Sequence, residues 1–230
     1  VDSKQTYVAG YKTKGFTPMH LSVMDGGLDM VEYIYYMSLN YGGMEVFLAD
    51  TTGKVNLLSG SQPQLDGLKL SENGKKAAYL DTDANTGDTI LVESELGKEK
   101  AETVATNVQS FGYIGNTLIY YFDYTEGVGT LGAAGSKTTI ANASGVQFTE
   151  DAVYYVADAD AATGNGELRA WDGKTETAIA KDVFAFQYKD NGKLVYIGKY
   201  DVNAGVGDLY YYDGKEARKL DTGVTAIFIY

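Results

Sequence analysis

The apolar positions of this chain fall into short runs that alternate like strands and are separated by Gly, Asn and Asp. Runs rich in Tyr, Val and Ile recur as EYIYYM, KKAAYL, TLIYYF, AVYYVA and KLVYIG. Each follows another β-type run after a tight turn of the Asp-Gly, Asn-Gly, Gly-Asn or Glu-Asp kind. Two such runs joined by so short a turn predict an antiparallel hairpin. The pattern therefore predicts an all-β protein.

The hairpins belong to a repeat of about 40 residues. A turn ending in Gly-Lys or, once, Gly-Ser-Lys recurs at spacings of 37 to 44 residues, with its lysine at Lys54, Lys98, Lys137, Lys174 and Lys215. Each unit holds four short runs, with a loop rich in Asp and Gly between the second and third. Four antiparallel strands at this period are typical of a β-propeller blade.

The repeats predict one propeller domain over residues 1–230. Five four-stranded blades occupy residues 20–222, and residues 223–230 form a closing strand of the inner type. Residues 1–19 offer a strand or two that could pair with that closing strand, and six blades are the alternative count. Residues 91–106 have the Glu, Lys, Ala and Leu content of a helix. The repeat register instead predicts a strand, a turn at Gly97 and a second strand there.

Composition and charge exclude several classes of site and of binding partner. The absence of Cys excludes disulfides, thiolate zinc sites and a Cys nucleophile. A net charge of −12 argues against nucleic acid and anionic membranes as partners. No apolar run approaches the roughly 18 residues of a membrane span, so direct membrane insertion is not expected. The start at Val1 suggests a mature fragment from which a leader or anchor was removed.

The blade pattern also resembles a known family. Its first strand ends in DNGK, and strands of the LVYIG, DLYYYDGK and EARKLDTG types follow. This order resembles bacterial TolB-like propeller repeats, and it is similar to the Tyr-rich propellers of unknown function in Gram-positive surface proteins and lipoproteins. The resemblance implies a non-catalytic scaffold that binds a protein, peptide or glycan outside the cytoplasm, at the cell surface, anchored through a removed N-terminal segment.

The loops between second and third runs carry the residue types of a calcium site. Asp81, Asp83, Asn85 and Asp88 alternate oxygen ligands as calcium loops do. The spacing departs from the EF-hand, however, because Thr86 stands where its glycine is required. Asp, Asn and Gly are also the residues that hairpin loops prefer. We therefore expect structural turns with no cofactor, with Ca²⁺ as the alternative.

Two further motifs have a structural explanation. Gly127, Gly129 and Gly132 satisfy the G-x-G-x-x-G pattern, but a dinucleotide site requires a helix after it, and here another strand is predicted. His20 is the only histidine, and no G-x-S-x-G accompanies it. We therefore expect His20 to be a structural residue.

The position after the first residue of each inner run is a candidate for lining a central channel. It is occupied by Ser22, Asp66, Gln109, Gln147, Phe184 and Thr225. A propeller glycosidase needs two or three carboxylates converging there, and this set contains one acid and two amides. The set favours a binding scaffold over an enzyme, although loop carboxylates such as Glu126, Glu150 and Asp151 could contribute.

The aromatic residues are the remaining feature. Most of the 20 tyrosines lie on second and third runs, where rings are expected to fill the space between blades. Some rings could stay exposed, and the candidates for a partner contact are Trp171, Tyr210 and Tyr212. Three functions follow as hypotheses: a binding scaffold first, then a carbohydrate-active propeller enzyme, and then a structural segment of a larger surface protein.

Overall fold

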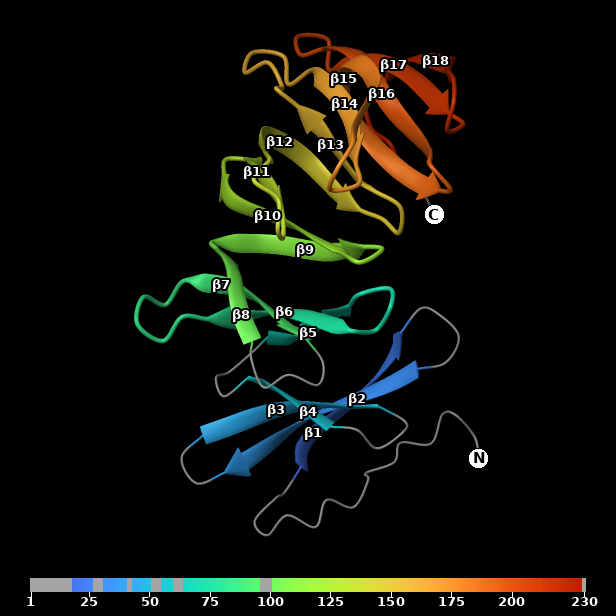
Figure 1. The fold of residues 1–230 in the computed structure, drawn as a ribbon. Coiled ribbons are helices and arrows are strands. Elements are labelled where there is room, and N and C mark those ends of the chain that lie inside the picture. Colours follow the sequence, from blue (N-terminus) through green and yellow to red (C-terminus); the bar gives the residue numbers. More distant parts are fainter. Residues whose placement is uncertain are drawn as a thin grey trace. The chain divides into compact units, whose positions relative to one another are not determined.

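The computed structural model describes the backbone of residues 18–26, 31–40, 43–50, 55–59, 64–95 and 101–228, with side chains from residue 68 onward. Regular secondary structure in these ranges is entirely β, in eighteen strands (Figure 1). The chain divides into two compact units, Val1–Val108 and Gln109–Tyr230, and each is described by itself. The strands predicted within residues 1–19 lie outside the described residues, except that the first strand begins at Pro18.

The first unit contains two four-stranded antiparallel sheets in which strand order follows the sequence. The first sheet is made of β1 (Pro18–Gly26), β2 (Val31–Asn40), β3 (Gly43–Asp50) and β4 (Val55–Ser59). The second is made of β5 (Gln64–Leu70), β6 (Lys76–Thr82), β7 (Thr89–Glu95) and β8 (Ala101–Thr106). Because β7 and β8 pair in antiparallel register, the prediction of two strands within residues 91–106 is confirmed and the helix alternative is wrong.

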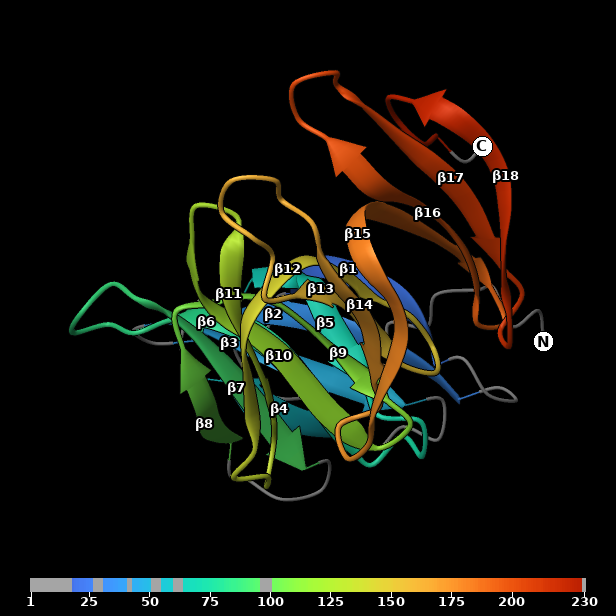
Figure 2. The same cartoon turned by 90° about the horizontal axis from the view of Figure 1, so that it is seen from above.

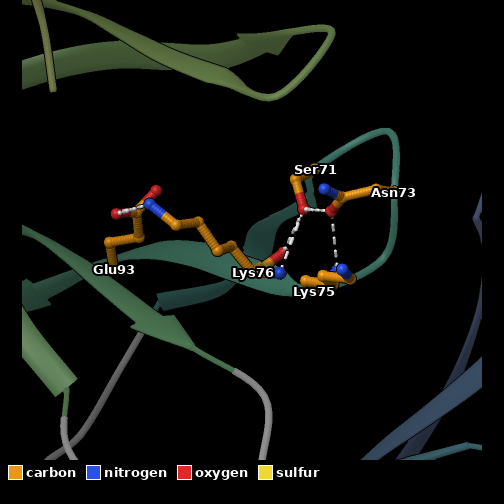
Figure 3. Close-up of polar contacts among 5 residues, drawn as sticks. All are labelled: Ser71, Asn73, Lys75, Lys76 and Glu93. Atoms are coloured by element: carbon orange, nitrogen blue, oxygen red, sulfur yellow. Dashed lines mark hydrogen bonds and ion pairs between the residues drawn. The ribbon is translucent and has the colours of Figure 1, made fainter.

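The turn between β5 and β6 shows how local chemistry fixes a hairpin (Figure 3). The Ser71 hydroxyl accepts a hydrogen bond from the Lys76 N–H at 3.0 Å, and the Asn73 side chain accepts one from the Lys75 N–H at 3.0 Å. Gly74 has φ 63°, a left-handed conformation that glycine adopts without strain. Lys76 also pairs with Glu93 on β7 at 2.8 Å. The predicted Asn-Gly turn is therefore confirmed.

The second unit is built on one ten-stranded antiparallel sheet whose strands also follow sequence order. It runs through β9 (Val108–Ile114), β10 (Thr117–Thr125), β11 (Val128–Ala133), β12 (Thr139–Phe148), β13 (Val153–Ala157), β14 (Gly166–Trp171), β15 (Glu176–Asp190), β16 (Lys193–Asp201), β17 (Val206–Tyr212) and β18 (Ala217–Val224). The first residue of β9 belongs to the first unit by the division above.

Two long strands divide this sheet into consecutive meanders of four strands. The first part of β12 pairs with β11 and its last part with β13, and β15 is shared between β14 and β16 in the same way. Positive φ values at Asn142, Gly145 and Asp182 mark the bends in these strands. We call β9–β12 meander A, β12–β15 meander B and β15–β18 meander C. The predicted four-strand unit is thus present three times in this sheet.

The core of the second unit lies between facing meanders. Tyr155 of meander B is fully buried in a cluster with Ile119 and Leu131 of meander A. Its neighbour Tyr154 points the other way, into a cluster with Leu194 and Tyr196 of meander C. Alternation along β13 therefore buries one face of meander B against each neighbour. Face-to-face packing of successive four-stranded sheets is how propeller blades bury their apolar surfaces.

Glycines on third strands sit opposite the start of the next inner run. Gly129, Gly166 and Gly207 pair with Ala143, Val183 and Val224, respectively. A Cβ at any of the three glycines would lie 2.5 to 2.7 Å from a neighbouring atom. Because Gly129 and Gly132 lie on β11, which is followed by a strand, the dinucleotide pattern has no helix after it and the structural explanation is confirmed.

The end of the chain differs from its predicted form. β18 ends at Val224, and residues 225–228 form no strand. The predicted closing strand over residues 223–230 is therefore formed only up to Val224 among the described residues. Its pairing with the N-terminal residues stays a prediction.

Candidate functional site

The connections of the second unit lie at two ends of its strands. The β10–β11, β13–β14 and β16–β17 connections and the bends in β12 and β15 share one end, which we call the loop face (Figure 2). Hydrogen bonds join them: the Asp158 N–H donates to the Asn142 carbonyl at 3.1 Å, and the Asn142 amide donates to the Asp158 carboxylate at 3.2 Å. The hairpin turns at the other end form the turn face.

Three loops between second and third strands are built alike. The Asp83 carboxylate accepts hydrogen bonds from the N–H groups two and three residues later, and Asp160 and Asp201 do the same in their loops. A glycine N–H four residues after each Asp then donates to that Asp's carbonyl oxygen. These loops of β6–β7, β13–β14 and β16–β17 are therefore Asp-capped turns, as the sequence predicted.

The capping bonds also set the charge of these loops. Bonds from the backbone N–H groups of Asn85 and Thr86 lower the pKa of Asp83 below its usual value. The pKa of Asp160 is lowered by the Thr163 N–H first, and then by the Thr163 hydroxyl and the Ala162 N–H. Both carboxylates therefore remain ionised at neutral pH.

Capped turns recur on the turn face. Asp172 accepts bonds from the Lys174 and Thr175 N–H groups at 2.8 and 2.6 Å. Asp213 accepts the equivalent pair from the two residues after Gly214, both at 2.9 Å. The recurring Asp-Gly-Lys sequence is thus a turn whose carboxylate bonds its own backbone.

The four calcium candidates lie in different surroundings. Asp81 is 2% exposed within β6 and accepts a hydrogen bond from the Thr82 N–H. Asp83 caps the loop, and Asn85 and Asp88 are exposed. In the part of the chain that is described, no three His, Cys, Asp or Glu side chains gather in a way that could hold a metal ion.

The channel candidates do not share one register. Asp66 lies on β5 and Gln109 is exposed on β9. Phe184 and Thr225 each follow a residue that pairs with a third-strand glycine. In β12 the residue in that place is Ser144, so Gln147 lies three residues further along. The bend in β12 precedes Ala143 by one residue, as the bend in β15 precedes Val183, so the inner part of β12 begins at Ala143 rather than at Val146.

Gln147 bonds the backbone of the neighbouring meander. Its Nε2 donates to the Phe186 carbonyl at 3.1 Å, and its Oε1 accepts from the Tyr188 N–H at 3.1 Å. Both functions of the amide are therefore used between the inner parts of β12 and β15. The hydrogen-bonding capacity expected of Gln147 is therefore used within the protein itself.

Phe184 forms an exposed aromatic pair on the loop face. Its ring stacks on Tyr200 with centroids 3.9 Å apart and an angle of 7° between the planes. Asn165 holds the Tyr200 backbone, since its Nδ2 donates to the carbonyl at 3.0 Å and its Oδ1 accepts from the N–H at 3.3 Å. A Cβ at Gly164 would lie 3.1 Å from the Phe184 ring edge. The Phe184 side chain is still 38% exposed.

The aromatic contact candidates are mainly packing residues. Trp171 is 2% exposed and belongs to the core between meanders A and B. Tyr210 stacks on Tyr196 with centroids 4.9 Å apart, and Tyr212 packs against the core between meanders B and C. His20 lies on β1, and its side chain is outside the described residues.

A charged cluster borders the core of meander B. Arg169 pairs with Glu176 at 2.8 Å and with Glu167, and the Tyr155 hydroxyl donates to Glu176. Burial acts to raise the pKa of Glu176, but the bonds from Arg169 and Tyr155 outweigh it and the pKa is lowered. Burial is the main cause that raises the pKa of Tyr155. Each charge in this cluster has a partner, so the cluster is a structural feature.

Sequence reasoning missed the residues that support Phe184. Asn165 and Tyr200 are 35 residues apart, and neither stands out in its own repeat. One signal was present: Phe184 occupies a place that Ser144 and Thr225 hold in the neighbouring repeats. A large aromatic side chain where other repeats have a small hydroxyl residue indicates a local role.

Comparison with known proteins bears on the fold. No sequence family and no curated protein matches the chain. Among solved structures it is similar to the tricorn protease, with a TM-score of 0.50, 12% identity and coverage of 93% of this chain and 28% of that chain. The β-propeller domain of the trilobed protease from Pyrococcus furiosus gives a TM-score of 0.48 and 14% identity over 87% of this chain and 71% of that one.

TolB from Acinetobacter baumannii is also similar, with a TM-score of 0.41 and 13% identity over 83% of this chain and 52% of TolB. The structural neighbours are β-propellers, so an all-β antiparallel chain with a propeller-like fold is what the likeness supports. The chain spans less than two thirds of the tricorn protease and of TolB. At these identities the likeness concerns the fold alone.

Proposed function

We propose that this chain is a β-propeller scaffold, without catalytic activity, that binds a protein partner through its loop face. Each four-stranded sheet of the first unit and each meander of the second unit is then one blade, which gives five blades. The regular order of strands and the packing of meander B against both neighbours support this count. A crystal structure of the chain would count the blades directly.

The observation that carries the proposal is the distribution of exposed apolar side chains in the second unit. Tyr124, Val128, Phe184 and Val202 are 37% to 51% exposed and all lie at the loop face. The other large exposed apolar side chains there, Leu220 and Phe228, are on β18 and after it. Exposed aromatic and aliphatic side chains gathered on one face are typical of a protein-binding surface.

The polar side chains support a scaffold rather than an acid–base site. Gln147 uses both functions of its amide between meanders, and the aspartates of the loops and turns cap their own backbones. Among the described residues there is no helix with the length and apolar content needed to cross a membrane. The proposal includes the cell-surface location that the TolB-like resemblance implies, which fractionation of the source cells would test.

The experiment compares two faces of one protein. A loop-face variant carries Tyr124→Ser, Phe184→Ser and Val202→Ser, and a matched turn-face variant carries Lys137→Ser, Lys174→Ser and Lys215→Ser, all at exposed positions. Each is immobilised and exposed to proteins of the source organism, and retained proteins are quantified by mass spectrometry. A partner should be retained by the wild type and the turn-face variant and lost from the loop-face variant. Equal retention by all three proteins would refute the proposal.

A further inference from the structure

We infer that the Phe184–Tyr200 pair is the anchor of the loop face and that it receives an arginine side chain of a partner peptide. The inference rests on the proposed function and gives it a partner chemistry. We call Phe184, Tyr200, Asn165 and Gly164 the aromatic anchor.

The first support is that the anchor is rigid before any partner arrives. Tyr200 stacks on Phe184 in nearly parallel planes. Both backbone groups of Tyr200 are bonded by the Asn165 amide. Gly164 leaves room for the ring edge, because a Cβ there would approach it to 3.1 Å. An exposed ring fixed in this way loses little conformational freedom on binding.

The second support is the charge around the anchor. Asp160 belongs to the β13–β14 loop, which also contributes Gly164, and Asp201 directly follows Tyr200 and caps the β16–β17 loop. Asp158 comes two residues before Asp160, and Asp182 comes two residues before Phe184. Lys181 and Lys199 are the positive groups of these segments, so acidic side chains outnumber basic ones. The loop bonds of Asp160 and Asp201 all use their Oδ1 atoms. The whole chain carries a charge of −12, so a cationic partner is favoured at long range.

Arginine matches both features at once. A planar guanidinium stacks on an aromatic face and can bond a carboxylate with its N–H groups. A sugar could also stack on the ring and donate its hydroxyls to the carboxylates, but a neutral sugar gains nothing from the charge of −12. The Asn165 amide, which could bond a sugar hydroxyl, has both of its functions occupied by Tyr200. The observations therefore favour an arginine-containing peptide over a glycan.

The test uses two-dimensional NMR titration of the full chain. The probes are an acetylated and amidated Gly-Arg-Gly-Arg-Gly peptide, the same peptide with Lys in place of Arg, and cellobiose. We expect shift changes from the arginine peptide at residues around Phe184, with weaker binding of the lysine peptide. Phe184→Leu should lower the affinity for the arginine peptide by roughly 2- to 30-fold, which corresponds to the loss of one cation–π contact.

Two more variants separate the effect of charge from the effect of an exposed aromatic ring on peptide binding. Asp201→Asn keeps an oxygen that can cap the loop and removes the charge, so it should weaken binding and flatten its dependence on salt. Phe228→Leu is the matched control, since Phe228 is an aromatic residue that is 77% exposed after β18 and does not belong to the loop-face set. It should bind the peptide as the wild type does.

Several outcomes would overturn the inference. Equal binding by Phe184→Leu, equal affinity for the lysine peptide, or shifts located elsewhere would each do so. Binding of cellobiose without the peptide would assign the anchor to a glycan instead. The proposed function fails separately, when the loop-face variant retains the same partner proteins as the turn-face variant.

Discussion

Gln147 of β12 accepts a hydrogen bond from the backbone N–H of Tyr188, 41 residues later on β15, at 3.1 Å. The same amide donates to the carbonyl of Phe186 at 3.1 Å. One side chain thus satisfies a donor and an acceptor of the neighbouring inner run. Because these groups lie on the inner parts of β12 and β15, the contact links two meanders, as the Asn165 amide does through the Tyr200 backbone.

The first prediction concerns this link. Gln147→Leu removes both bonds and leaves the Tyr188 N–H and the Phe186 carbonyl without them. We expect a loss of about 1–3 kcal/mol in the free energy of unfolding, the usual cost of unsatisfied polar groups. Chemical denaturation followed by the fluorescence of the buried Trp171 measures it. Gln109→Leu, at an exposed position of β9, is the control. Equal losses for the two variants would contradict the prediction.

The second prediction concerns the close approach at Gly207. A Cβ there would lie 2.5 Å from Ile197 Cγ2 and 2.8 Å from the Gly198 carbonyl oxygen. Gly207→Ala should therefore destabilise the protein by about 1–3 kcal/mol through overpacking. At Gly198 the nearest atom would be 3.3 Å away, so Gly198→Ala should cost less. Thermal unfolding of both variants gives the comparison, and a larger loss at Gly198 would show that the backbone near Gly207 can move.

The sequence predicts well what short-range chemistry decides. Asp83 and Asp160 bond N–H groups two and three residues away, so the loop can be identified from its own residues. The alternation that buries Tyr154 and Tyr155 on opposite sides of β13 is equally local. Strand order in each sheet followed the predicted repeat for the same reason, since every connection within a unit is short.

Contacts between repeats could not be predicted in this way. The bends at Asn142 and Asp182 each come one residue before the residue that pairs with a third-strand glycine. In that register Phe184 corresponds to Ser144 rather than to Gln147, which the apolar pattern of the inner runs does not reveal. The Phe184 ring stacks on Tyr200, whose backbone is bonded by Asn165 from a third segment. No single repeat contains the information for this arrangement.

The third prediction concerns acid. The pKa of Asp172 is lowered chiefly by the Thr175 N–H, and that of Asp213 chiefly by the Glu216 N–H. A lowered pKa in the folded state means that the unfolded chain binds more protons as the pH falls. The contribution of these two carboxylates to the free energy of unfolding is therefore complete above their pKa in the unfolded chain. It is lost as the pH falls below about 5 and through their pKa in the folded protein.

A double variant isolates this effect. Asp172→Asn with Asp213→Asn keeps oxygens that can accept the same backbone bonds and removes the titration. Denaturation between pH 7 and pH 2 should show a shallower loss of stability for the variant than for the wild type. Asp151→Asn, which changes an exposed carboxylate of the turn face that accepts no such pair of bonds among those described, is the control. Parallel pH curves for the wild type and the double variant would count against the capping explanation.

The fourth prediction concerns alkali. Burial, followed by the charge of Tyr124, raises the pKa of Tyr121 to about 12. Burial, followed by Tyr188, Asp151 and Tyr212, raises that of Tyr154 to about 12. In the unfolded chain both phenols ionise near pH 10. Because their pKa is raised in the folded state, these two phenols contribute to the free energy of unfolding. That contribution is complete below pH 10 and is lost as the pH rises toward 12.

Titration of phenolate absorbance in the native protein should therefore show a group of tyrosines that ionise together with unfolding, above the pH at which they ionise in denaturant. Tyr121→Phe should remove one of these and make the alkaline loss of stability less steep. It also removes the bond from the Tyr121 hydroxyl to the Ala143 carbonyl at 2.9 Å, so stability at pH 8 should fall by about 1 kcal/mol. If all tyrosines ionise near pH 10 while the protein stays folded, the hydroxyls of Tyr121 and Tyr154 are reached by solvent and the packing between meanders is looser than described.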